Sequence, residues 1–149
     1  MNALVKVMAA MAAPLLAVGL PAAWAEVMPI RHFVNLGTVG NELTLTPPEV
    51  TLRVGETYQF VVSNPSQAKH VVSAPELLAT TKTAKLATSS PWVEHPAASL
   101  KAGISMQPGA MMEWTFTPNK EGTYKFGCDT PAHAAAGMSM RIRVVSGSI

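Results

Sequence analysis

Three side chains near the C-terminus have the right chemistry to bind a soft metal ion. The only cysteine, Cys128, is followed by His133 and Met138 in the spacing Cys-x4-His-x4-Met. A thiolate, an imidazole and a thioether suit copper, and a trigonal copper site with a weak axial methionine needs a second imidazole. His70, at the end of a strand-like run upstream, is the histidine that we assign to this place. The four residues predict a copper site assembled from two distant parts of the chain.

Each of these residues also has an ordinary structural interpretation. A lone cysteine is often a small buried hydrophobic residue, and Met138 could fill the core beside Met140. A histidine at a strand end is often only a polar tip, and His32 and His95 are the other histidines available as a second imidazole. The ligand spacing and the need for two imidazoles favour the copper site over these alternatives.

A second group of sulfur atoms lies upstream, where Met106, Met111 and Met112 flank a turn at Pro108-Gly109. Thioethers bind Cu(I), so an accessory copper-loading site is one interpretation of this group. Packing is the preferred interpretation, because methionine fills irregular gaps in cores and at sheet edges.

Short stretches of the chain alternate apolar and polar residues with a period of two, which is typical of half-buried strands. Proline, glycine and asparagine separate them, a pattern that indicates an all-β sandwich or barrel. The apolar positions of these stretches are Leu43 and Leu45; Val50, Leu52 and Val54; Tyr58, Phe60 and Val62; Trp114 and Phe116; Tyr124 and Phe126; and Met140, Ile142 and Val144.

The phase of the last two stretches predicts where the sulfur atoms point. Cys128 continues the face of Phe126, and Met138 is in register with Met140, so both sulfurs are expected to face the core. His133 lies between them in an alanine-rich loop with almost no charge. We therefore expect His133 at an apolar rim, at one end of the sandwich.

The secondary structure of residues 75–108 is the hardest to predict from the sequence. Pro75 could open a short helix, because proline is tolerated at the first helical position. Residues 80–90 are rich in threonine and lysine, and Pro91, Pro96 and Gly103 interrupt regular structure after them. We expect a long excursion between strands that is irregular or partly helical.

Residues 1–25 have the layout of a cleavable secretory signal peptide, with Lys6, an apolar run and small residues before the cleavage point. An uncleaved membrane anchor is the alternative, but the run of about 14 residues, interrupted by Pro14 and Gly19, is shorter than the roughly 20 needed to span a bilayer. No cysteine stands at the cleavage point for a lipid anchor. Residues 26–149 are expected to form one exported domain, because 124 residues are enough for a single hydrophobic core and too few for two.

The mature chain is nearly neutral. Removing Lys6 leaves ten basic and nine acidic side chains, a net charge of about +1, and no long run of one sign occurs. This balance gives no indication of nucleic-acid binding. A single cysteine in an exported protein cannot form an internal disulfide, so metal binding is one way in which it would be occupied.

Several segments together resemble the cupredoxins, the small blue-copper proteins of the plastocyanin, azurin and rusticyanin kind. They are GTYKFGCDTPAHAAAGM with the following MRIRVV, the earlier LTPPEVTLRVGETYQFVVSN, and Lys69-His70. The Cys-x4-His-x4-Met loop is most similar to that of rusticyanin. The resemblance implies a Greek-key β-sandwich, one-electron transfer, and one type 1 copper held by His70, Cys128, His133 and an axial Met138.

One position departs from the family pattern. Many cupredoxins have asparagine or serine after the first histidine ligand, whereas this chain has Val71. A valine side chain neither donates nor accepts hydrogen bonds, so any contact from this residue to the Cys128 sulfur must come from the backbone. Since such contacts tune a copper site, we expect Val71 to affect the reduction potential more than metal binding.

The leading functional prediction is a periplasmic or otherwise exported electron carrier. Its expected partner is a redox protein such as a cytochrome or an oxidase, docking at the apolar rim around His133, with the carrier itself a monomer. The alternative is a copper-binding protein for copper buffering, delivery or resistance. An enzyme is not expected, because four histidines are too few for the additional copper centres of the oxidases and nitrite reductases that resemble this fold.

Overall fold

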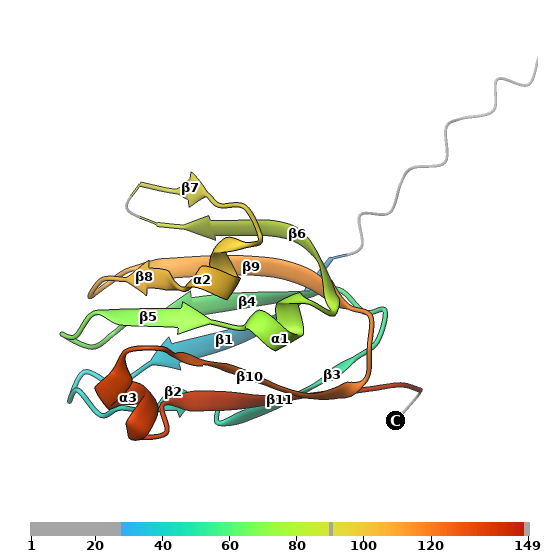
Figure 1. The fold of residues 1–149 in the computed structure, drawn as a ribbon. Coiled ribbons are helices and arrows are strands. Elements are labelled where there is room, and N and C mark those ends of the chain that lie inside the picture. Colours follow the sequence, from blue (N-terminus) through green and yellow to red (C-terminus); the bar gives the residue numbers. More distant parts are fainter. Residues whose placement is uncertain (1–27, 90, 148–149) are drawn as a thin grey trace, which may run out of the picture.

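The computed structural model describes residues 28–89 and 91–147, which fold as two sheets packed in a sandwich (Figure 1). The predicted signal peptide, residues 1–25, lies outside the described residues. One sheet has the strand order β2-β1-β4-β9-β6-β7, and the other has the order β3-β11-β10-β5-β8. Their all-β architecture confirms the predicted fold class.

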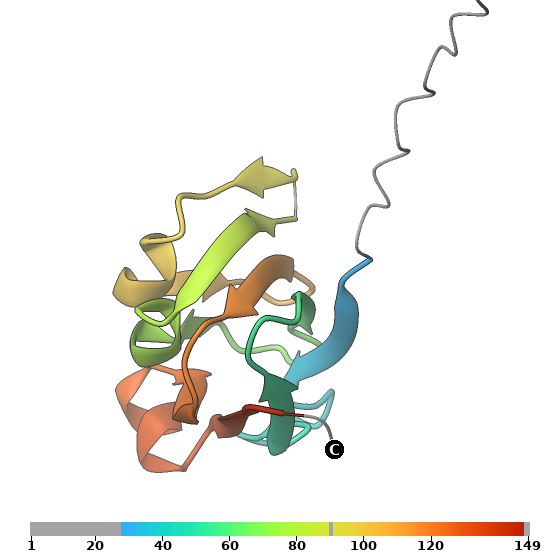
Figure 2. The same cartoon turned by 90° about the vertical axis from the view of Figure 1, so that its right-hand side faces the viewer.

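The strands of the first sheet are β1 (Ile30–Leu36), β2 (Leu45–Thr46), β4 (Tyr58–Ser63), β6 (Thr81–Thr88), β7 (Val93–Glu94) and β9 (Met111–Pro118). Those of the second sheet are β3 (Glu49–Arg53), β5 (His70–Ser73), β8 (Ile104–Met106), β10 (Gly122–Cys128) and β11 (Ser139–Val145). Three short helices complete the fold: α1 (Pro75–Leu78), α2 (Ser99–Ala102) and α3 (Pro131–Ala135). Figure 2 shows these helices on the side of the sandwich away from β1.

Aromatic rings hold the two sheets together. Phe60 of β4 meets Phe126 of β10 edge to face, with ring centroids 6.2 Å apart, and it meets Phe116 in the same way at 5.0 Å. All three rings are fully buried. Edge-to-face pairs of this kind stabilise a core beyond the area that they bury. The packing fixes β10, and with it Cys128 at its end, against the opposite sheet.

The strands expected from period-two alternation are confirmed in β3, β4, β9, β10 and β11. Their apolar residues face the core, as the buried alternate positions of β9 and β11 show. Pro75 occupies the first turn of α1, as predicted. Within residues 28–89 and 91–147, no helix is both long and apolar enough to cross a membrane.

Residues 75–108 are more regular than the sequence indicates. They contain α1 and α2, as a partly helical excursion would, but also β6, β7 and β8. The eight-residue β6 pairs with β9, with a register shift between Thr83 and Lys85. Only Leu86 and Ala87 of this strand are buried. Because its strand structure depends on pairing with β9 and not on an alternating apolar face, the sequence pattern misses it.

Strand β1 is also absent from the sequence-based prediction. It pairs in parallel with β4, from Ile30 opposite Tyr58 to Asn35 opposite Ser63. Its apolar residues do not all lie on one face, since neighbouring strand residues point to opposite sides and the exposed Phe33 precedes the buried Val34. The neighbouring strand therefore determines this element more than its own pattern does.

Candidate metal centre

Three elements bring the predicted copper ligands to one end of the sandwich. His70 begins β5, Cys128 ends β10, and His133 lies in α3. Strands β5 and β10 are antiparallel neighbours, with Cys128 opposite Val72. Since paired strands lie about 4.8 Å apart, this register sets Cys128 beside the start of β5. Figure 1 shows α3 at the same end of the molecule.

The ligand atoms of these three residues converge. The two Nδ1 atoms of His70 and His133 are 3.2 Å apart, and Cys128 Sγ lies 3.8 Å from the first and 3.6 Å from the second. They form a group of side chains placed to hold one metal ion. The sequence places His70 and Cys128 more than 50 residues apart, so only the fold unites them.

These separations fit a single metal ion. With metal–nitrogen bonds of about 2.0 Å and metal–sulfur bonds of about 2.3 Å, a planar trigonal site would separate the nitrogens by about 3.5 Å and each nitrogen from sulfur by about 3.7 Å. The observed values of 3.2, 3.8 and 3.6 Å are close to that arrangement. Two imidazoles and one thiolate are also the equatorial ligands of a blue-copper site. The residues therefore fit one copper ion.

His70 is enclosed by protein. Its side chain is fully buried, and its Nε2 atom lies 2.9 Å from Ser66 Oγ. Burial lowers the pKa of His70, and the neighbouring His133 lowers it further. The neutral imidazole is the form that binds a metal, so the environment favours the binding-competent state.

Gly37, at the end of β1, allows the chain to pass close to this histidine. Its φ is +74°, in the left-handed region that favours glycine. A Cβ at this position would lie 3.0 Å from the carbonyl oxygen of Glu42 and 3.2 Å from Ser66 Cβ. A side chain here would therefore disturb Ser66 and, through it, the surroundings of His70.

His133 is half-buried and lies in a short helix, whereas the sequence predicted a loop. Pro131 in the first turn and the alanines around His133 favour helical structure, which explains the difference. Two backbone bonds close this segment: the Met138 N–H donates to the His133 carbonyl at 3.1 Å, and the Cys128 N–H donates to the Met138 carbonyl at 3.0 Å. The predicted apolar rim is present as a turn of exposed alanines: Ala132, Ala134, Ala135 and Ala136.

Met138 and Cys128 both face inward, as the strand phase predicted. Met138 is 1% exposed and Cys128 is fully buried. The backbone bond between them keeps the two residues adjacent. The role of Met138 as an axial ligand stays a prediction.

Val71 contributes through its backbone. Its carbonyl accepts the Asp129 N–H at 2.7 Å, which ties the strand carrying His70 to the residue after Cys128. Gly103 makes room for its side chain, because a Cβ there would lie 2.7 Å from Val71 Cγ1. The two ligand segments are thus joined next to the site without a polar side chain at this position.

The other two histidines are engaged elsewhere. His95 Nε2 lies 2.8 Å from Thr88 Oγ1, and the His32 ring packs against Tyr58 and Phe60 at centroid distances of 5.7 and 5.8 Å. Burial lowers the pKa of His32. The structure thus supports His70 over His32 and His95 as the second imidazole.

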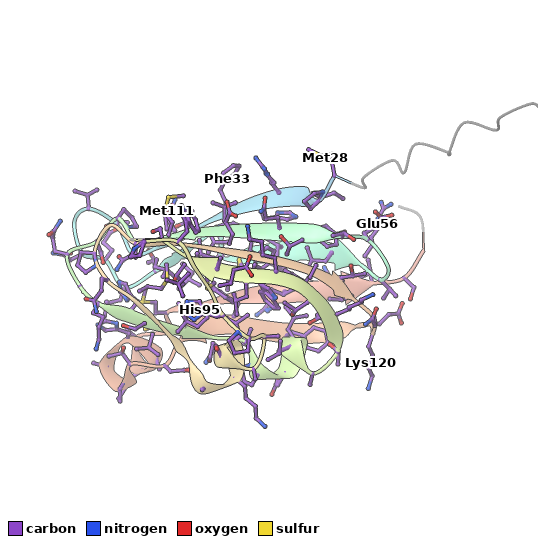
Figure 3. All side chains as sticks on the ribbon, turned by 90° about the horizontal axis from the view of Figure 1, so that it is seen from above. Met28, Phe33, Glu56, His95, Met111 and Lys120 are labelled. Carbon is purple, nitrogen blue, oxygen red and sulfur yellow. The ribbon has the colours of Figure 1, made fainter. Side chains whose placement is uncertain are left out.

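The three methionines near Pro108-Gly109 do not share one face. Met106 and Met112 are fully buried in the core, whereas Met111 is 38% exposed. Met111 and Met112 are consecutive in β9, and consecutive strand residues point to opposite sides. Figure 3 shows Met111 and the exposed Phe33 on the outer side of the β1 sheet. This arrangement agrees with the packing role that the sequence favoured.

Ser66 and Asn64 were missed as residues of the site. As a sequence, Asn64-Pro65-Ser66 has only the composition of a turn that closes the alternation of Tyr58, Phe60 and Val62. In the structure both side chains are buried and belong to a hydrogen-bonded group that reaches His70. A serine four residues before a proposed histidine ligand is the signal that could have identified them.

The chain is similar to known copper proteins in sequence and in structure. Residues 33–145 match the family described as copper binding proteins, plastocyanin/azurin family. The copper-resistant cuproprotein CopI of Vibrio cholerae is 25% identical over 128 residues, covering 85% of this chain and 72% of that protein.

Two solved structures show the same fold. Reduced auracyanin from the photosynthetic bacterium Roseiflexus castenholzii aligns with a TM-score of 0.53 at 19% identity, covering 77% of this chain and 96% of that one. A multicopper oxidase from Campylobacter jejuni aligns with a TM-score of 0.59 at 12% identity, covering 80% of this chain but only 31% of the oxidase. The closer likeness of the ligand loop to rusticyanin stays a prediction. Since the family match spans most of the sandwich and the ligand end, the chain belongs to the plastocyanin/azurin family of copper-binding proteins.

Proposed function

We propose that the protein is an exported blue-copper protein that carries single electrons between redox partners. The observation that supports this most is the convergence of His70 Nδ1, His133 Nδ1 and Cys128 Sγ within a packed β-sandwich. A copper ion held by these ligands would supply a Cu(I)/Cu(II) couple. The ligands are held by paired strands and backbone hydrogen bonds, which limit their movement when the charge of the ion changes.

The two imidazoles suit different parts of this task. His70 is buried, which keeps water away from the metal, while His133 is half-buried and reaches the protein surface. The half-exposed ring offers a short route for an electron between the metal and a docked protein. Exposed alanines surround it, so contact with a partner would be mainly apolar.

We propose that the partner is a redox protein, such as a cytochrome or an oxidase, that docks over α3. The exposed side chains of α3 are Pro131, Ala132, Ala134 and Ala135, and none carries a charge. Small apolar contacts of this kind favour weak complexes, and fast dissociation is required for turnover. Export is supported by the signal-like residues 1–25 and would place the protein in the periplasm or outside the cell.

Copper handling is the second candidate, because the curated relative CopI is described as a copper-resistant cuproprotein. In that role the protein would bind, buffer or deliver copper. The methionine group gives this role little support, since Met106 and Met112 are buried in the core. The single metal-ligand group of the described residues is compatible with either role.

We further propose that the protein is not an enzyme. Of its four histidines, His32 and His95 make contacts away from the metal-ligand group. The other two histidines, His70 and His133, already belong to the metal-ligand group, so no pair of imidazoles remains for a second copper centre. The Campylobacter jejuni oxidase shares only the fold of one part, since this chain covers 31% of it.

Voltammetry of the copper-loaded protein, combined with copper analysis after each cycle, tests the carrier proposal. An electron carrier is expected to show a reversible one-electron couple and to retain one copper per chain through repeated reduction. Loss of Cu(I) to a moderate-affinity chelator during reduction, without recovery of the couple, would contradict it and favour delivery. Cys128→Ser serves as the control that lacks the thiolate.

A further inference from the structure

We propose that Ser66, oriented by Asn64, is a positioning residue that fixes the tautomer of His70 so that Nδ1 is free to bind copper. The inference concerns the hydrogen bonds around His70 Nε2, on the side of the ring away from Cys128. It rests on His70 being a copper ligand, but not on whether the copper carries electrons or is delivered.

The amide of Asn64 has one possible orientation. One end lies 2.8 Å from the Ala68 carbonyl oxygen and 2.9 Å from the Met106 carbonyl oxygen. Both oxygens only accept hydrogen bonds, so this end must be the NH2 group. The other end, Oδ1, accepts the backbone N–H of Ser66 at 3.1 Å. The two ends of the amide independently require the same orientation. The hydrogen-bond partners therefore determine which end is oxygen and which is nitrogen.

The orientation of Asn64 determines what the Ser66 hydroxyl does. Ser66 Oγ lies 2.8 Å from Asn64 Oδ1, an atom that only accepts hydrogen bonds. A hydroxyl has one proton, so donating it to Asn64 leaves the oxygen lone pairs for its other neighbours. The Ala68 carbonyl, at 3.3 Å, competes for the same proton and would have the same effect.

His70 Nε2 must then be the donor in its 2.9 Å contact with Ser66 Oγ. A neutral imidazole carries one N–H, so a proton on Nε2 leaves Nδ1 with a free lone pair. That atom lies 3.2 Å from His133 Nδ1 and 3.8 Å from Cys128 Sγ, at the centre of the metal-ligand group. The opposite tautomer would place a proton where the metal binds.

The contact between Ser66 Oγ and His70 Nε2 is buried, so water would not replace the hydrogen bond if the hydroxyl were removed. Asn64, Ser66 and His70 are all buried. A copper-bound His70 keeps its proton on Nε2, and without the hydroxyl this donor would have no partner in that contact. Hydrogen-bond partners of this kind typically change metal affinity by about 10- to 100-fold when removed.

Ser66→Ala removes the hydroxyl while keeping the backbone N–H that donates to Asn64. A matched control is Ser63→Ala, which removes another serine hydroxyl that donates to an asparagine, Asn35, at 2.6 Å. Ser66→Thr keeps a hydroxyl and tests rescue. Thermal unfolding of each copper-free variant reports whether it is folded.

The first readout is the tautomer itself, measured by ¹⁵N NMR of the histidine rings in copper-free protein at about pH 8, above the ordinary histidine pKa of about 6.5. Wild type and Ser63→Ala are expected to hold His70 with its proton on Nε2, slow to exchange with water. Ser66→Ala is expected to exchange that proton faster and to populate both tautomers. A wild-type His70 protonated on Nδ1 would overturn the proposal even if no variant folds.

The second readout is the affinity for Cu(I), measured by competition with a chromophoric chelator. Ser66→Ala is expected to bind about 10- to 100-fold more weakly than wild type, with Ser63→Ala unchanged and Ser66→Thr restored. A folded Ser66→Ala protein with wild-type affinity and wild-type tautomer would overturn the proposal, as would a Ser66→Thr protein that behaves like Ser66→Ala.

Discussion

The segment before His70 and the segment around His133 hold their imidazoles by different means. Residues 64–70 use buried side chains, in which Asn64 orients Ser66 and Ser66 contacts the His70 ring. Residues 129–138 use backbone bonds, including the Met138 N–H to the His133 carbonyl, and their alanines face solvent. The His70 imidazole is enclosed by a network of polar side chains, whereas the His133 imidazole is held in place by backbone hydrogen bonds of its segment.

The difference indicates how a copper protein can be rigid and accessible at once. Buried polar groups specify a single arrangement when all are satisfied, but each substitution among them is costly. Backbone bonds leave the side chains of α3 free to form a surface. Substitutions near His70 should therefore alter the metal site, and substitutions around His133 should alter encounters with other proteins.

The largest difference between the two segments is expected for removal of each imidazole. His133→Gly would open the site toward solvent, so added imidazole is expected to enter and restore most of the visible thiolate band. His70→Gly would leave a gap in the interior, where added imidazole has no comparable access, and little recovery is expected. Titration of both copper-loaded variants with imidazole, followed by absorption, measures this. Equal recovery in the two variants would contradict the division between them.

Met138 follows the exposed segment but is itself buried, and Met138→Gln tests whether it acts on the metal. An amide oxygen is a harder ligand than a thioether and should stabilise Cu(II) relative to Cu(I). A tenfold preference corresponds to a potential lowered by about 59 mV for one electron, and we expect a decrease of at least this size in voltammetry. An unchanged potential would restrict Met138 to core packing.

A charge on α3 tests the surface assigned to docking. Ala134→Asp is expected to leave the copper spectrum unchanged and to slow electron self-exchange between Cu(I) and Cu(II) molecules by about tenfold, because two like charges would meet across the contact. Asn119→Asp adds the same charge beside the start of β10, at the other end of that strand from Cys128. NMR line widths in mixtures of the two oxidation states give the rates. Equal slowing by both variants would argue against docking at α3.

The smallest effect concerns the copper-free protein. Burial and the neighbouring His133 lower the pKa of His70, so the unfolded state takes up its proton at a higher pH than the folded state. The free energy of unfolding should therefore decrease as the pH falls below about 6.5, the ordinary histidine value, toward the lowered pKa. His70→Gln should reduce this decrease in urea unfolding measured across that range. The same pH dependence in wild type and variant would show that other groups cause it.

The sequence predicted the exposed segment better than the buried one. Cys128, His133 and Met138 are close in sequence, so ligand spacing and strand phase were sufficient to place their side chains. His70 could be assigned only by the number of ligands that copper requires, and its contact with Ser66 depends on how the chain turns after β4. Turn geometry of this kind is not visible as a periodic pattern.

The same physical reason explains the parts of the fold that were missed. Strand β1 has an exposed apolar residue, Phe33, that breaks its alternation, and the two buried residues of β6 are consecutive; the two strands form through pairing with β4 and β9. Their structure is a property of distant partners, which one sequence does not reveal. Strands β9 and β11 were predictable because alternate residues enter the core.

Addition of Cu(II) to the copper-free protein, followed by absorption and electron paramagnetic resonance, tests most directly whether His70, Cys128 and His133 hold one blue-copper ion. The expected result is an intense visible thiolate band that saturates at one copper per chain and is abolished in a folded Cys128→Ser variant. A visible band that survives in Cys128→Ser, or a colourless wild-type complex, would contradict the assignment.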